Sequence, residues 1–167
     1  MSQVLVDEDY QTGYRYMREA PMGADFAADF TPDLTPQQML QLGIFGGDYF
    51  TQMPAEFPAE WFDGVTFSMT GAQKALNYFR VNASQPLSVW QQKGWIYPED
   101  PLGWFLWYCR YYSGRRIADE DARQIKRWRM MRRHASQVQK YCQPGDLVCR
   151  PRQRQALLHW AYDSRLL

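Results

Sequence analysis

The stretch from Trp104 to Arg116 constrains the fold more than any other part of this sequence. Its thirteen residues include seven large apolar or aromatic side chains and three arginines. On a helix that begins near Trp104 and ends at Gly114, the rings cover most of the circumference, which is typical of a helix buried at the centre of a domain. We therefore expect most of these rings to be core residues.

The arginines of this stretch divide into two kinds. Arg110 falls inside the helix, and a buried guanidinium needs a carboxylate, several carbonyl groups or a bound anion. The acidic first hundred residues could supply that carboxylate, so we expect an internal ion pair. Arg115 and Arg116 follow the end of the helix and are expected to face solvent.

Start and stop signals elsewhere predict an all-α fold, mainly helical with long loops. Thr35 as a cap, Pro36 in the first helical position and Gln38 for a capping box predict a helix over 36–42. Similar patterns predict helices over 57–64, 70–80, 86–93, 119–141 and 151–163, and Asp100 is expected to cap the aromatic helix. The chain of 167 residues suits a compact single domain of six to eight helices around the aromatic helix.

The first 33 residues show no helical pattern. They contain five aromatic rings, which disordered segments generally lack. We therefore predict that residues 1–33 form an N-terminal arm whose rings dock on a helical body comprising residues 34–167.

Charge is distributed unevenly along the chain. Residues 1–100 carry five Lys or Arg against thirteen Asp or Glu, a net charge of −8, whereas residues 101–167 carry fourteen against five, a net charge of +9. Such an asymmetry indicates either two complementary faces or a basic surface for an anionic partner.

The predicted helix over 119–141 concentrates the positive charge. Between residues 123 and 140 it has seven cations and no acid, although a solvated helix normally mixes the two signs. Two more arginines fall in the first turn of the last predicted helix, where cations oppose the helix dipole. The residues predicted to bind an anion or nucleic acid are Arg110, Arg115, Arg116, Arg123, Lys126, Arg127, Arg129, Arg132, Arg133, Arg152 and Arg154.

Aromatic rings interleaved with arginines favour a nucleic-acid-binding protein, because cations meet phosphates and rings stack on exposed bases. The predicted aromatic lining of such a site is Trp104, Trp107, Tyr108 and Tyr111. One alternative is a small-molecule enzyme that binds an anionic or phosphorylated substrate between the aromatic helix and the turn at Gly46–Asp48. Another is a self-associating protein, a homo-oligomer whose acidic and basic faces meet.

Signatures of nucleophilic or metal-dependent catalysis are absent from the sequence. The catalytic candidates are Asp48, at a glycine-rich turn, and His134, on the basic helix. No cofactor and no metal site is predicted, and the sequence leaves open whether the protein is an enzyme.

The N-terminal sequence turns acidic after three apolar residues, unlike a signal peptide, and no apolar run approaches the ~20 residues that span a bilayer. These features predict a cytoplasmic protein with no membrane partner. Cys142 and Cys149 flank a Pro-Gly turn and could pair in an oxidising compartment, but free thiols are the default expectation in the cytosol.

Overall fold

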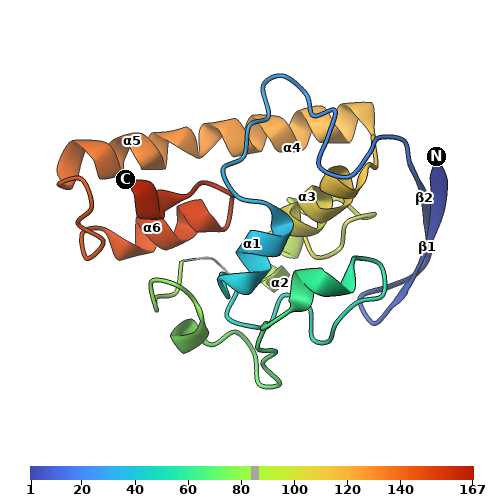
Figure 1. Ribbon diagram of the computed structural model, residues 1–167, viewed down its shortest axis with the longest axis horizontal. Coiled ribbons are helices and arrows are strands. Elements are labelled where there is room, and N and C mark those ends of the chain that lie inside the picture. Colours follow the sequence, from blue (N-terminus) through green and yellow to red (C-terminus); the bar gives the residue numbers. More distant parts are fainter. Residues whose placement is uncertain (84–86) are drawn as a thin grey trace.

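The computed structural model describes residues 1–83 and 87–167 (Figure 1). The aromatic helix α3 (Trp104–Ser113) lies in the interior of the molecule. Nine of its ten residues are buried, including both tryptophans and Arg110. The predicted mainly helical single domain is confirmed. The other helices are α1 (Pro36–Gln41), α2 (Leu87–Gln92), α4 (Ala118–Met130), α5 (Arg132–Tyr141) and α6 (Pro151–Leu158), with single 3-10 turns at Ala59–Phe62, Lys74–Leu76 and Ser164–Leu166.

Helix α1 begins as its sequence predicts. The Thr35 hydroxyl accepts a hydrogen bond from the Gln38 backbone at 3.1 Å, and the Gln38 side chain accepts one from the Thr35 backbone at 2.9 Å. This reciprocal capping satisfies two donors that the first turn leaves without partners.

The helix expected over 70–80 is wrong apart from the single turn at Lys74–Leu76. The backbone of Gln73 instead donates to the carbonyl of Gly46 at 3.0 Å. A Cβ atom on Gly46 would lie 2.7 Å from the Gln73 nitrogen, so only glycine permits this approach. The glycine-rich turn therefore packs against residues 66–76.

The predicted N-terminal arm is largely an antiparallel hairpin of β1 (Ser2–Glu8) and β2 (Gln11–Arg18), at one edge of the molecule (Figure 1). Val4, Val6 and Tyr16 form its buried face. The segment that follows docks its rings as expected. Phe30 is 2% exposed and makes edge-on contacts with rings of α3 and α4.

The long basic helix predicted over 119–141 is divided into α4 and α5. At Met131 the backbone changes to three-residue hydrogen bonding, from Met131 to Trp128 and from His134 to Met131. Both helices nevertheless follow nearly one line across the molecule (Figure 1). The last helix, α6, ends at Leu158 and is shorter than the expected 151–163.

A disulfide between Cys142 and Cys149 closes the connection from α5 to α6. The default expectation of free thiols at these two positions is therefore wrong. Cys109, inside α3, is buried with a free thiol. Among the described residues, no helix is both long and apolar enough to cross a membrane.

Candidate functional site

The Arg110 side chain pairs inside the molecule, as the sequence led us to expect. Its Nε donates to Glu56 at 2.7 Å and its Nη1 donates to Asp100 at 2.9 Å, and all three side chains are fully buried. Burial alone would lower the pKa of Arg110, but the hydrogen bonds and charge of Glu56, together with Asp100, raise it. The guanidinium is therefore a fixed charge with its counter-charges in place.

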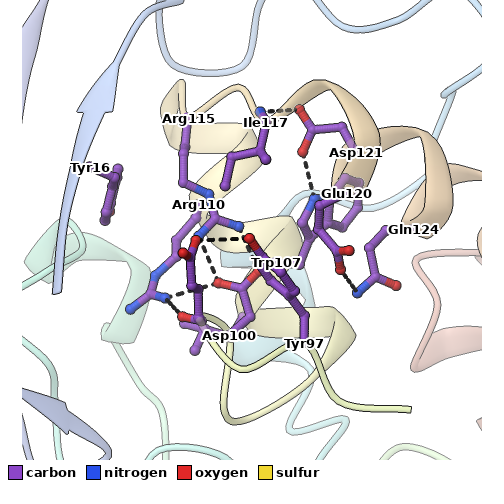
Figure 2. Close-up of polar contacts among 12 residues, drawn as sticks. Tyr16, Tyr97, Asp100, Trp107, Arg110, Arg115, Ile117, Glu120, Asp121 and Gln124 are labelled. Carbon is purple, nitrogen blue, oxygen red and sulfur yellow. Dashed lines mark hydrogen bonds and ion pairs between the residues drawn. The ribbon is translucent and has the colours of Figure 1, made fainter. Parts of the chain in front are cut away.

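Arg115 shares the same acid. Its two terminal nitrogens donate to the two oxygens of Asp100 at 2.7 and 2.6 Å, and Figure 2 shows both arginines converging on that carboxylate. Because Arg115 is 2% exposed, the expectation that it faces solvent is wrong. Asp100 likewise does not cap α3, since its oxygens are occupied by guanidinium groups and Gly103 stands at the cap position.

The β-hairpin completes this network. Tyr10 and Tyr16 donate their hydroxyl hydrogens to Glu56 at 2.8 and 2.7 Å, and Gln11 accepts from Arg110 at 2.7 Å. Burial, reinforced by the charge of Glu56, raises the pKa of Tyr16. Two guanidinium groups face two carboxylates, so the network is electrically balanced and ties the hairpin to α3.

Two further predicted anion-binding residues are also used internally. Arg154 is fully buried and donates to main-chain oxygens of Cys149, Ser164 and Leu167 at 2.8–2.9 Å. Arg116 is half-buried over the Tyr111 ring and donates to the main-chain oxygen of Tyr111 in α3 and to those of Ala24 and Asp25, which lie between β2 and α1. Both residues join backbone segments and present little free charge to a ligand.

The remaining predicted cations lie at or near the surface of α4, α5 and the start of α6. Arg123 pairs with Glu120 of its own helix, and Arg129 pairs with Asp29 of the acidic half. Within the described residues, four exposed cations of α4 and α5 have no carboxylate within 4.0 Å; we call them the basic face: Lys126, Arg132, Arg133 and Lys140. Among the residues that the structure describes, the acidic half therefore pairs with one of the seven cations of α4 and α5.

Arg127 occupies an unusual environment between the basic face and the core. It is half-buried, and its guanidinium carbon lies 5.7 Å from the ring centre of Trp90 and 5.2 Å from that of Trp160. Burial, with some help from the charge of Arg123, lowers its pKa. No carboxylate of the described chain forms an ion pair with it.

A cleft of about 1140 Å³ opens next to these rings, and we call it the tryptophan cleft. Four tryptophans from separate segments line it: Trp90, Trp95, Trp104 and Trp160. Trp95 is 41% exposed and Trp104 is 4% exposed, so the aromatic lining runs from the surface to the core. Arg133 lines the same cleft, which therefore adjoins the basic face.

The polar groups of the tryptophan cleft include both catalytic candidates. Asp48 and His134 line it, together with Lys74 and His159. Burial lowers the pKa of His159 to about 4, against a smaller opposing effect of the Ile44 carbonyl. Burial, and then the charge of Arg133, also lowers the pKa of His134. In both residues burial therefore favours the neutral imidazole.

The four residues predicted as aromatic lining lie in different places. Trp104 lines the cleft, whereas Trp107, Tyr108 and Tyr111 are at most 2% exposed and pack in the core. Sequence reasoning missed three lining tryptophans: Trp90, Trp95 and Trp160. The sequence does hold a clue to Trp90 and Trp95, which are five residues apart. Gly94, directly before Trp95, turns the chain with φ +68°.

Arg152 is exposed at the start of α6 and donates to the main-chain oxygen of Asn82, a residue of the cleft lining. It thus adds positive charge beside the cleft. Comparison of the chain with protein-family models, curated proteins and solved structures gave no match.

Proposed function

We propose that the protein binds single-stranded nucleic acid, with the phosphates on the basic face. The observation that carries this proposal is the set of four exposed cations without carboxylate partners in the described chain. Cations that are neither paired nor buried are free to replace the counterions of a phosphate backbone.

The arrangement of the basic face suits an extended polyanion. From Lys126 to Lys140, fourteen residues along nearly collinear helices span roughly 20 Å at the rise of an α-helix. Arg133 and Lys140 are spaced seven residues apart within α5, which is about two helical turns. A strand lying along this face would meet one cation after another.

The neighbouring aromatic rings favour a single strand over a duplex. Rings at the surface can stack on bases only when those bases are unpaired. Trp95 is exposed, and Trp90 and Trp160 are half-buried in the cleft beside Arg133. A duplex would cover the cations but leave these rings without bases to stack on.

A fluorescently labelled single-stranded oligonucleotide of about 12 nucleotides tests the proposal by anisotropy at low salt. The variant Arg132→Gln/Arg133→Gln/Lys140→Gln removes three cations of the basic face. We expect a loss of at least about 10-fold in affinity, because counterion release by three phosphate contacts is removed. Unchanged binding by this variant would refute the assignment of the basic face.

A control changes the net charge equally at the opposite end of the molecule. The variant Gln3→Glu/Thr12→Glu/Arg15→Gln alters three exposed hairpin residues and lowers the charge by the same three units. Its affinity should stay within about 3-fold of wild type if binding is local to α4 and α5. Equal losses in both variants would point to a diffuse effect of net charge.

A small-molecule enzyme is the second candidate, favoured by the presence of both Asp48 and His134 in one cleft. A carboxylate and a neutral imidazole could act as general acid and base on a phosphorylated substrate. A thermal-shift screen with nucleotides and phosphorylated metabolites tests this candidate. A stabilising compound should lose its effect in Asp48→Asn, and silence across the screen would count against it.

Two broader predictions stay predictions. One is the cytoplasmic location. The Cys142–Cys149 disulfide argues against it, because such bonds persist mainly in oxidising compartments.

The other is self-association through acidic and basic faces. It would be seen as salt-sensitive oligomers in analytical ultracentrifugation, and a monomer at low salt would exclude it.

A further inference from the structure

Two polar atoms in the wall of the tryptophan cleft have no hydrogen-bond partner in the described chain. They are Nε1 of Trp90 and Nε2 of His159, and both are inaccessible to solvent. An indole nitrogen can only donate, whereas a neutral imidazole offers one donor and one acceptor. Buried polar groups normally have partners, but a ligand in the cleft would reach these two nitrogens only if the Trp90 and His159 side chains turned toward it on binding.

The same wall offers flat ring faces, and Arg127 lies beside two of them although it does not line the cleft. The Trp90 and Trp160 rings lie 26° from parallel with centroids 6.4 Å apart, and the guanidinium of Arg127 lies over both. His159 packs against Phe45, with centroids 5.0 Å apart. Rings of this kind favour a planar ligand, and Arg127 favours an anion because it has no described carboxylate partner.

Three classes of ligand can be compared with this surface. An alkyl chain would fill the apolar volume but would use none of the cations that line the cleft. A neutral sugar could stack on a tryptophan but would use neither Arg127 nor the exposed Lys74 and Arg133 at the cleft. A nucleobase with its phosphate matches the planar faces and the cations together.

We propose that the tryptophan cleft is a nucleobase-binding subsite that takes one unpaired base, with its phosphate directed to Arg133. The inference rests on the proposed function and deepens it, because it assigns bases to the cleft and phosphates to the basic face. A cleft of about 1140 Å³ has room for a base, its sugar and its phosphate while the strand continues outward.

The test compares two oligonucleotides of equal length and phosphate number, one with ordinary bases and one abasic at every position. Wild type should bind the ordinary strand at least about 5-fold more tightly, as expected for stacking of one base. Trp90→Leu should lose that preference while retaining its affinity for the abasic strand. Tyr78→Leu, which alters a 42% exposed ring outside the cleft lining, should keep the preference.

The outcomes separate the two proposals. Equal affinity of wild type for both strands would overturn the nucleobase subsite and leave nucleic-acid binding intact. A preference that survives both Trp90→Leu and Trp160→Leu would also overturn it, since the bases would then bind elsewhere. The retained abasic affinity of each variant reports that it is folded.

A second measurement keeps the subsite testable if no oligonucleotide binds. Nucleoside monophosphates are titrated against wild type, and tryptophan fluorescence is recorded. Saturable quenching that Trp90→Leu abolishes would support the subsite although the proposed function had failed. No quenching in wild type, together with no oligonucleotide binding, would refute both.

Discussion

Substitution of Glu56 by glutamine tests whether the buried network holds the hairpin to α3. One oxygen of Glu56 accepts from Tyr16 and from Nε of Arg110, and the other accepts from Tyr10 and from Nη2 of Arg110. Glu56→Gln replaces one of these two accepting oxygens with an amide nitrogen, which donates. The guanidinium nitrogen and the tyrosine hydroxyl that donate to that oxygen in the wild-type protein would then face another donor. The negative charge that balances Arg110 is also lost.

The cost follows from burial. Removing one member of a buried ion pair typically costs about 3–5 kcal/mol, because the remaining charge is left uncompensated in the interior. Here Asp100 still contacts Arg110 but must balance Arg115 as well, so we expect a loss within that range. For a chain of this size the melting temperature should fall by on the order of 10 °C.

Urea denaturation followed by tryptophan fluorescence measures the change in unfolding free energy. Glu60→Gln is the matched control, since Glu60 is exposed and its side chain makes no hydrogen bond in the described chain; it should stay within about 0.5 kcal/mol of wild type. A Glu56→Gln protein as stable as Glu60→Gln would refute the structural importance of the network.

Three other predictions concern stability. The double variant Cys142→Ser/Cys149→Ser should lose about 2–3 kcal/mol, as loop-closure entropy predicts for so short a loop, and dithiothreitol should destabilise wild type but not the variant. The pKa of His159 is about 4 in the folded protein and about 6.5 in the unfolded chain. Its contribution to the free energy of unfolding is therefore complete above pH 6.5 and is lost as pH falls toward 4. Wild type should lose about 2 kcal/mol more than His159→Gln between pH 7.5 and pH 5 in urea titrations, and parallel losses would contradict the assignment. Phe30→Ala should cost about 3–5 kcal/mol by calorimetry, because the ring contacts α3 and α4; a loss under 1 kcal/mol would show that it is not core.

The central helix could be predicted because its information is local. The density of rings from Trp104 to Tyr112 requires burial on nearly every side, and a buried Arg110 requires a carboxylate. The capping signals of Thr35 and Gln38 are also local, and that helix formed as expected. In each case the residue types alone restrict the structure strongly.

The hairpin carried a weaker signal that was missed. Tyr14 and Tyr16 flank the polar Arg15, but the apolar Leu5 between Val4 and Val6 hides the alternation of the first strand, and the two-residue connection Asp9-Tyr10 is not one of the usual glycine-containing hairpin turns. Without that turn signal the segment resembled an arm.

The tryptophan cleft could not have been predicted from local patterns. Its walls come from residues near 45, 74, 90, 133 and 159, which only the tertiary fold brings together. The same holds for the partners of the cations: Asp29 reaches Arg129 from 100 residues away, while the basic face receives no such partner among the described residues. Charge along the chain indicates a basic half but not which charges are already balanced.

The salt dependence of oligonucleotide binding tests the central claim most directly. The affinity of wild type for a single-stranded oligonucleotide is measured from 20 to 300 mM salt, and the logarithm of the association constant is plotted against that of the salt concentration. Four phosphate contacts on the basic face predict a slope of about −3, and Arg132→Gln/Arg133→Gln/Lys140→Gln should bring it to about −1. A wild-type slope near zero, or no binding at 20 mM salt, would contradict the account.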